Sequence, residues 1–334
     1  MFAAWAMSAV STDPVERLEA ALGISQTAPR KRMLVIVNPY ATTVSDRLKN
    51  LVVYALRGSY DVEAVDTQKQ GHATELGRQA AREGYDAVVA FGGDGTLNEA
   101  ANGLVGSATA LGCLPGGRTN VFCRILGIPH DVVDATEHLL QMADRWTTRP
   151  VDLGTAGERR FLFSAGVGLD ASVVEQVDAH PQLKARFGEY YYTMITLRLF
   201  NRHYLRRPPQ LEASVGARRL EGISAFVQNA APYTYFGTRR IDIGEGATLH
   251  SGDLSAAVLR RANLADIPTL AWRALSPRAK VASHRQISAC SGVSEVEIRS
   301  RDERPLPLQV DGDYIGQFDQ VSFGIEPAAL QVVA

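Results

Sequence analysis

From residue 33 to residue 126 the chain alternates short apolar segments with segments of helical pattern. The apolar segments are rich in β-branched side chains, and the segments between them repeat apolar residues at helical spacing. Strict alternation of strand and helix predicts a parallel sheet with helices on both faces, an α/β fold. The expected strands are 33–37, 60–65, 86–91 and 110–114, and the expected helices are 47–56, 72–83, 97–104 and 120–126.

One turn in this alternation has the composition of a phosphate-binding turn. It reads Gly92-Gly93-Asp94-Gly95-Thr96 and connects an expected strand to an expected helix. Glycine lets backbone N–H groups approach a polyphosphate closely, and the positive end of the following helix points to the same place. Phosphates repel a carboxylate, so Asp94 has two open roles. It either binds a divalent cation between itself and the phosphates, or it orders the turn from behind.

Thr96 and Glu99 offer a structural alternative for the same turn. Their T-x-x-E spacing is that of a capping box, which would start the helix in any protein. A helix start needs at most one glycine, whereas this turn has three. We therefore predict that the turn contacts a nucleotide.

A second domain is expected after Pro150. A chain of 334 residues exceeds the size that one hydrophobic core usually serves. Beyond Pro150, short alternating segments separated by glycines and charged turns predict a β-rich sandwich. We expect an N-terminal extension at 1–30, an α/β nucleotide-binding domain at 31–150 and a β-sandwich substrate domain at 151–317.

The charge and cysteine content exclude several classes of protein. With 35 basic and 36 acidic side chains, the chain is not a nucleic-acid binder by charge. Residues 151–310 hold 21 basic and 16 acidic side chains, against 14 and 20 elsewhere, so the basic middle can face an anionic surface. Three cysteines without a C-x-x-C pair exclude a disulfide framework and a cysteine zinc site, which fits a reducing cytoplasm. No apolar run approaches the length that spans a bilayer.

A helix expected at about 190–205 carries Arg198, Arg202 and Arg206 at i, i+4 and i+8 beside apolar residues. A cationic amphipathic helix of this kind can lie on anionic lipid. The same stripe occurs more often in a helix that packs on its own domain. Both alternatives stay open.

The segment from Gly166 to Ala171 matches the dinucleotide fingerprint G-x-G-x-x-A only superficially. No βαβ unit is expected after it, so we interpret it as a turn that lines a cleft. The sequence has no G-x-x-x-x-G-K-[ST], which excludes a Walker-type phosphate loop.

Near the C-terminus, Asp311-Gly312-Asp313 has two carboxylates on either side of a glycine. Asp-Gly is the commonest hairpin signal, so a hairpin turn is the simplest interpretation. In a phosphoryl transferase, one carboxylate accepts the proton of the attacking hydroxyl and others hold magnesium. Asp311 is our candidate for that base.

Several motifs occur in a distinctive order along the chain. They are Val37-Asn38-Pro39, Thr67 with Gly71-His72-Ala73, Gly92 to Glu99, Leu114 to Asn120, Ser164 to Gly168, and Val310 to Asp313. In this order, over about 32–330, the chain resembles the diacylglycerol kinase catalytic-domain family of lipid kinases, in its bacterial branch. The glycine-aspartate turn alone is shared with NAD kinases and phosphofructokinases, whereas the ordered set is specific.

This resemblance implies a two-domain kinase that uses ATP and Mg²⁺. Asp94 and its loop would lie at the phosphates, Asp94 and Asp313 would hold the metal, and Asp311 would be the general base. The residues implied to bind the nucleotide are Asn38, Thr67, Gly92, Gly93, Asp94, Gly95, Thr96, Thr119 and Asn120.

The resemblance also implies a substrate and a location. A diacylglycerol-like lipid would receive the γ-phosphate on a hydroxyl group, between the two domains and at an anionic membrane surface. The protein would be cytoplasmic and peripheral to the inner face of the membrane, without a nucleic-acid partner, and a homodimer is compatible with this expectation. The family's C-terminal segment returns to the first domain, a role that suits about 318–334.

Three positions depart from the family's pattern. Val121 stands where many members have aspartate, Asp313 where many have glutamate, and the turn from His250 to Asp253 where an acidic turn often holds a structural magnesium. Two alternatives stay open, and the departures motivate the second of them. One is a kinase of the NAD kinase type, which would act without lipid, and the other is a catalytically silent regulator, which would bind ATP without phosphate transfer.

Overall fold

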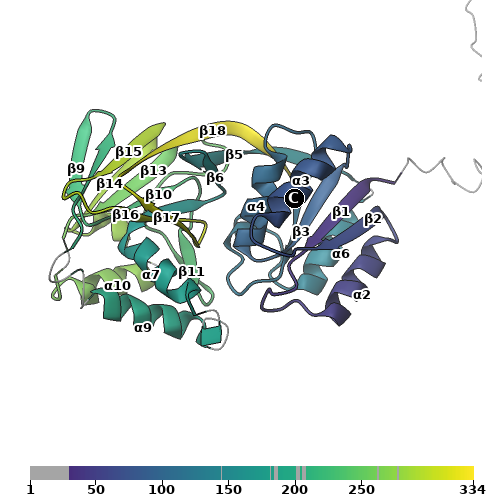
Figure 1. Ribbon diagram of the computed structural model, residues 1–334, viewed down its shortest axis with the longest axis horizontal. Helices are drawn as coiled ribbons and strands as arrows, with labels where there is room; N and C mark the ends of the chain where they lie inside the picture. The colour runs from purple at the N-terminus through teal and green to yellow at the C-terminus, as the bar shows by residue number, and fades with distance from the viewer. Residues whose placement is uncertain are drawn as a thin grey trace, which may run out of the picture.

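The computed structural model describes residues 30–143, 145–180, 182–183, 187–200, 204, 208–261, 263–276 and 278–334. The extension expected at 1–30 lies outside these residues except for Arg30, and so do Arg202 and Arg206 of the expected basic stripe. Figure 1 shows two lobes, with strand β18 running from one to the other. None of the helices in the described ranges is long and apolar enough to cross a membrane.

The first lobe contains the alternation that the sequence predicts. Its strands are β1 (Arg32–Val37), β2 (Asp61–Asp66), β3 (Ala87–Gly92) and β4 (Ala110–Pro115). Its helices are α2 (Asp46–Leu56), α3 (His72–Arg82), α4 (Asp94–Leu104), α5 (Val121–Leu126) and α6 (Val132–Met142). Each expected element is present, α4 begins earlier than expected, and α6 is additional.

The strand order of this lobe creates a binding edge. The sheet runs β2-β1-β3-β4-β18, and β1 pairs in parallel with both β2 and β3. Helices α3 and α4 pack on each other, as do α2 and α6, and right-handed crossovers put the two pairs on opposite faces. The chain therefore leaves β1 and β3 in opposite directions, and ligands of such sheets bind at the carboxyl ends of these strands.

The second lobe is a β-sandwich with a layer of helices. Its elements are β5 (Thr148–Ala156), β6 (Arg159–Phe161), β7 (Ser164–Gly168), α7 (Leu169–Asp178), α9 (Glu189–Leu199), β8 (Leu211–Val215), β9 (Arg218–Gly222), β10 (Ser224–Gln228), β11 (Thr234–Phe236), β12 (Arg239–Ile241), β13 (Leu254–Leu259), α10 (Ile267–Leu275), η2 (Val281–Ser283), β14 (Ile287–Val293), β15 (Glu295–Ser300), β16 (Leu306–Val310), β17 (Asp313–Phe318) and β18 (Gln320–Val333). One sheet has the order β14-β13-β10-β7-β16-β17. It packs on the strands around β18 through a shared core, to which Phe161 and Phe323 contribute from one sheet and Val167 and Val227 from the other. The predicted fold class is confirmed.

Strand β18 joins the two lobes. Its first half pairs antiparallel with β15, where Gly324 faces Glu295, and its end pairs in parallel with β4, where Val332 faces Leu111. The C-terminal segment thus adds a strand to the sheet of the first lobe (Figure 1). The exact domain boundaries stay a prediction.

The segment that begins at Gly166 differs from its expectation. Gly166 and Gly168 belong to strand β7, in the middle of the second sheet, and helix α7 begins directly after it. The interpretation as a cleft-lining turn is wrong because this backbone is paired on both sides, with β10 and with β16.

Candidate active site

The carboxyl ends of β1, β2 and β3 bring three predicted site segments together. The Asn38 side chain donates from Nδ2 to Oγ1 of Thr96 at 3.1 Å, and its Oδ1 accepts the backbone N–H of Tyr40 at 3.0 Å. The Thr67 backbone N–H donates to the carbonyl of Val37 at 2.8 Å. These contacts hold the ends of neighbouring strands in one position relative to the glycine turn.

The two glycine-rich loops of this edge pack on each other. The Gly116 N–H donates to the carbonyl of Gly92 at 2.8 Å, and a Cβ at Gly117 would lie 3.0 Å from Cα of Gly93. Asn120, which has a positive φ of 46°, accepts the Gly117 N–H at 2.9 Å on Oδ1. Larger residues would separate the loops, so the glycines act through close backbone contact as well as through any approach to phosphate. Thr119 lies in the same turn.

Helix α4 begins at Asp94 and has no side-chain cap. The capping-box interpretation of Thr96 and Glu99 is wrong. The Glu99 carboxylate instead accepts the N–H groups of Gly71, at 2.7 Å, and Ala73, at 3.2 Å, so it caps the start of α3. The N-cap residue of α4 is Gly93, which has no side chain to accept the first N–H groups of this helix, at the place where an anion is expected.

Asp94 orders the neighbouring turn in this structure. Its Oδ2 accepts the Val121 N–H and its Oδ1 the Phe122 N–H, both at 3.0 Å, so it caps the start of α5. Partial burial raises the pKa of Asp94 to about 6, while these two hydrogen bonds oppose the rise. Each oxygen accepts one hydrogen bond and keeps a further lone pair, so the cation-binding role stays compatible with this geometry.

The β16–β17 turn of the second lobe lies against the start of α4. A Cβ at Gly95 would lie 2.9 Å from Oδ1 of Asp313, so only glycine leaves room for this carboxylate. The negative charge of Asp313 also contributes to the raised pKa of Asp94. The two predicted metal ligands, one from each lobe, are therefore close neighbours.

Replacing Gly95 by Ala is expected to lower both activity and stability. An alanine inside a helix usually stabilises it by about 0.5 to 1 kcal/mol relative to glycine. Here the new methyl group overlaps the Asp313 carboxylate and must push the β16–β17 turn away. Urea denaturation and a kinase assay would test this expectation, and a variant that is more stable than the native protein and fully active would contradict it.

Asp311 is buried and accepts four hydrogen bonds. Its Oδ1 accepts the N–H groups of Phe163, at 3.0 Å, and Ser164, at 3.1 Å. Its Oδ2 accepts the N–H of Leu162, at 2.6 Å, and the side-chain amide of Asn98, at 2.8 Å. Burial raises the pKa of Asp311 to about 6, and the four donors oppose this rise. Asp311 and Gly312, with φ of 49° and 86°, form the tight hairpin turn that the sequence predicts.

Two asparagines of α4 hold the second lobe, and we did not predict them as site residues. Asn98 donates to Asp311 and to the carbonyl of Arg160, and its Oδ1 accepts from Nη2 of Arg159 at 2.7 Å. Asn102, one turn later, accepts the Arg160 N–H at 3.1 Å. Two asparagines at i and i+4 inside an expected helix are a signal that could have identified this contact. The helix of the phosphate turn is thus also the helix that positions Asp311.

A buried polar network supports the same hairpin turn from behind. Oε1 of Gln309 accepts the Gly312 N–H at 2.8 Å, and its Nε2 donates to Asp170 at 2.7 Å and to the Tyr233 hydroxyl at 2.8 Å. The Tyr233 hydroxyl donates to Asp170 at 2.5 Å. Burial raises the pKa of both Asp170 and Tyr233. A Cβ at Gly166 would lie 2.7 Å from the Tyr233 hydroxyl, which explains this glycine in β7.

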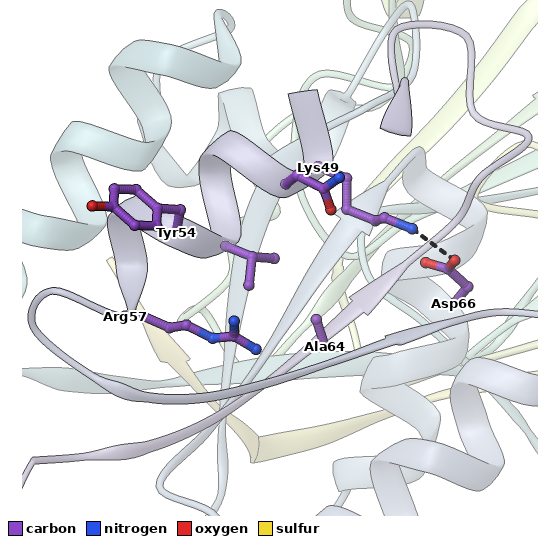
Figure 2. Close-up of a pocket in the computed structure, with 7 residues that line it drawn as sticks. Lys49, Tyr54, Arg57, Ala64 and Asp66 are labelled. Carbon is purple, nitrogen blue, oxygen red and sulfur yellow. Dashed lines mark hydrogen bonds and ion pairs between the residues drawn. The ribbon is translucent and has the colours of Figure 1, made fainter. Parts of the chain in front are cut away.

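Other candidate positions lie apart from this cluster. A cavity of about 450 Å³ lies between α2 and β2. The Lys49 ammonium pairs there with Asp66 at 2.8 Å, as the dashed line in Figure 2 marks. The cavity is lined by Lys49, Asn50, Val53, Tyr54, Arg57, Ala64 and Asp66, none of them a predicted site residue.

No group of three His, Cys, Asp or Glu side chains suited to a metal occurs in the described part of the chain. His250 lies in a turn, as expected, and Asp253 has a buried Oδ1 with no hydrogen-bond partner among the described residues.

Comparison with known proteins agrees with this arrangement. A sequence profile of the diacylglycerol kinase catalytic domain matches residues 32–156, which contain β1 to β5 and the glycine turn. Over these residues the chain is similar to the catalytic domain of diacylglycerol kinases. A protein from Bacillus subtilis (strain 168), named diacylglycerol kinase, is 26% identical over 293 residues, which cover 86% of this chain and 91% of the relative. A diacylglycerol kinase from Staphylococcus aureus (strain bovine RF122 / ET3-1) is 28% identical over 299 residues, covering 86% and 88%.

Solved structures of the diacylglycerol kinase family share the fold. The crystal structure of a diacylglycerol kinase from Bacillus anthracis str. Sterne aligns with a TM-score of 0.66 and 19% identity, over 92% of this chain and 98% of the other. Another structure from the same strain aligns over the same shares with a TM-score of 0.70. The similarity covers both lobes, so the pairing of an α/β lobe with a β-sandwich is common to these proteins.

Proposed function

We propose that this chain is an ATP-dependent lipid kinase that transfers the γ-phosphate to a hydroxyl of a diacylglycerol-like lipid. The contact between Asp313 and the start of α4 carries the proposal, because it brings a carboxylate of the second lobe to the phosphate-binding end of the first. The match to the diacylglycerol kinase catalytic domain at residues 32–156 and the diacylglycerol kinases that the chain resembles support the same reaction. The lipid hydroxyl would approach from the second lobe.

The first lobe is proposed to bind the triphosphate of ATP. The N–H groups at the start of α4, to which the N-cap residue Gly93 offers no side-chain acceptor, and the positive end of this helix favour an anion. Asn38, Thr67, Thr119 and Asn120 shape the surrounding loops, and the stacked glycines give the phosphates access to the backbone. Uncapped N–H groups bind phosphate oxygens in the same way in other nucleotide sites.

The donor set at this place fits Mg²⁺. Magnesium is usually held by one or two carboxylates together with phosphate oxygens and water. Asp94 keeps free lone pairs beyond its two hydrogen bonds. The negative charge of Asp313 lies close by and raises the pKa of Asp94, so a cation placed here would stabilise both carboxylates. Bound there, Mg²⁺ would offset the negative charge of the phosphates.

A carboxylate of the β16–β17 turn is proposed to accept the proton of the lipid hydroxyl. The sequence favours Asp311, but its four lone-pair positions all have donors and its side chain is buried. Asp313 is partly exposed beside the start of α4, so we propose Asp313 as the base and Asp311 as the residue that holds the turn. The role as a magnesium ligand that the sequence predicts for Asp313 is the competing assignment.

Radiolabelled ATP with a total lipid extract tests both the reaction and the base. The native chain is expected to label a lipid, and Asp313→Asn is expected to lower kcat at saturating Mg²⁺ without changing the Mg²⁺ requirement. A raised Mg²⁺ requirement with unchanged maximal rate would instead make Asp313 a metal ligand. A native chain that binds ATP but labels no lipid would refute the lipid kinase and favour the silent regulator.

The raised pKa values predict a pH profile. Asp94 and Asp311 are ionised only above about pH 6, and the proposed roles need both carboxylates charged. We expect kcat/KM to rise with pH through about 6 and then to level off, measured from about pH 5 to about pH 8. Both carboxyl groups have a higher pKa in the folded state than in the unfolded state, so their protonation as the pH falls favours the folded state. A loss of activity below about pH 6 would therefore not come from unfolding caused by these two groups. A flat profile through pH 6 would contradict the expectation.

A further inference from the structure

The helix layer of the second lobe has an exposed apolar face. On α9, Tyr191 and Ile195 are buried against α7, whereas Tyr190, Met194 and Leu197 point outward on the other side. Tyr190 is 81% exposed and Met194 is 55% exposed. A helix that is apolar on both sides is covered on both sides in its working state.

Helix α10 also has exposed apolar side chains. Trp272 is 61% exposed, and Leu264 and Leu275 are also exposed. The end of α9 and the inner side of α10 pack on one shared cluster that includes Phe200 and Leu270. Figure 1 shows the two helices next to each other on the second lobe. We define the α9–α10 face as Tyr190, Met194, Leu197, Leu264, Trp272 and Leu275.

The charges around the α9–α10 face are mainly basic. Residues 260–280 contain five Lys or Arg and one acidic residue, Asp266, which is buried and paired with Arg285 at 2.5 Å. Arg198, Arg260 and Arg278 are exposed and make no ion pair with a described residue. Apolar side chains surrounded by basic ones match an anionic bilayer, which has an apolar interior and negatively charged headgroups. A soluble protein that matched this surface would need an apolar centre and an acidic rim.

The α9–α10 face also reaches the candidate active site. Gly188, directly before α9, lies against Arg118 of the loop that follows β4, because a Cβ there would lie 3.0 Å from Cζ of Arg118. That loop packs on the glycine turn through Gly117 and Gly93. A lipid at the start of α9 would therefore be next to the loops proposed to bind ATP.

We propose that the α9–α10 face inserts into an anionic lipid bilayer and presents the acceptor lipid to the active site. This inference rests on the proposed lipid kinase function for its purpose, but the binding step needs neither ATP nor catalysis. Tyr190, Met194, Leu197 and Trp272 enter the interfacial region, and the arginines bind the anionic headgroups. The face thereby fixes the orientation of the second lobe on the membrane.

Sedimentation with vesicles in the absence of ATP tests the surface. The full chain is mixed with vesicles of phosphatidylcholine, with and without phosphatidylglycerol. We expect binding that depends on phosphatidylglycerol and weakens with salt. The double substitution Met194→Glu and Leu197→Glu should reduce vesicle binding by more than about tenfold, because each change places a charge where the proposal buries an apolar group in the bilayer. The matched control is Leu51→Glu with Tyr54→Glu, which makes the same charge change on the exposed face of α2 and should bind as the native chain does.

A fluorescence measurement covers the case in which the charged variant does not fold. In a Trp5→Phe and Trp146→Phe chain, Trp272 is the remaining tryptophan, and its emission should shift to shorter wavelength with anionic vesicles. An unshifted emission, or equal binding by the α9 and α2 variants, overturns the proposal. So does an α9 variant that changes a dimer into a monomer and leaves vesicle binding intact, since the face would then cover a second copy.

Kinase activity on detergent-dispersed short-chain diacylglycerol separates the two proposals. Phosphorylation of this substrate by a native chain that does not bind vesicles would refute the membrane face and leave the kinase intact. Vesicle binding that responds to the α9 variant as expected, in a chain that phosphorylates no lipid, would support the membrane face and refute the kinase.

Discussion

Replacing Asp94 by Asn is expected to reduce kinase activity by about 10² to 10³-fold. The carboxylate accepts two N–H groups at the start of α5, and an amide can serve only one of them because its other end is a donor. The substitution also removes the negative charge that fits Mg²⁺ beside the phosphates. The measurement is kcat/KM for ATP over a range of Mg²⁺ concentrations, and more Mg²⁺ should not restore the native rate.

The stability of Asp94→Asn should change much less than its activity. The loss of a helix cap costs about 1 kcal/mol, and the removal of a partly buried charge offsets part of this. Asp134→Asn is the matched control, because Asp134 is an exposed aspartate in the first turn of α6. Native activity in Asp94→Asn, or an equal loss in the control, would show that the glycine turn is only structural.

The fold could be predicted largely because its pattern is local. Strands β1, β3 and β4 are buried along nearly their whole length, so each reads as an unbroken apolar run between helices. The Asp-Gly hairpin is equally local, since the turn residues themselves set the backbone. The second half of strand β7 was interpreted as a turn because two glycines in a paired strand have the same letters as a turn.

The site could be predicted only in part because its contacts are distant in sequence. Glu99 has the spacing of a cap for its own helix but binds N–H groups of α3, 26 and 28 residues away. The donors to Asp311 lie between 147 and 213 residues away, so no local pattern reveals that its lone pairs are all occupied. Periodicity identified the helix at α9 but cannot say which of its two apolar sides is covered by the protein.

Replacing Asp311 by Ala is expected to lower the free energy of unfolding by about 3 to 5 kcal/mol. The substitution leaves three backbone N–H groups and the Asn98 amide without their acceptor in a buried place. It also removes the contact through which α4 holds the hairpin turn of the second lobe. Urea denaturation followed by circular dichroism would measure the change.

Asp253→Ala provides the contrast for this experiment, because Oδ1 of Asp253 is buried without a hydrogen-bond partner among the described residues. Removing an acceptor that has no donor should leave stability within about 1 kcal/mol of the native value. Equal effects of the two substitutions would mean that burial alone, and not the four hydrogen bonds, sets the cost. A large loss only at Asp311 would instead support the division of roles in the turn, in which Asp311 holds the backbone so that Asp313 can face the phosphates.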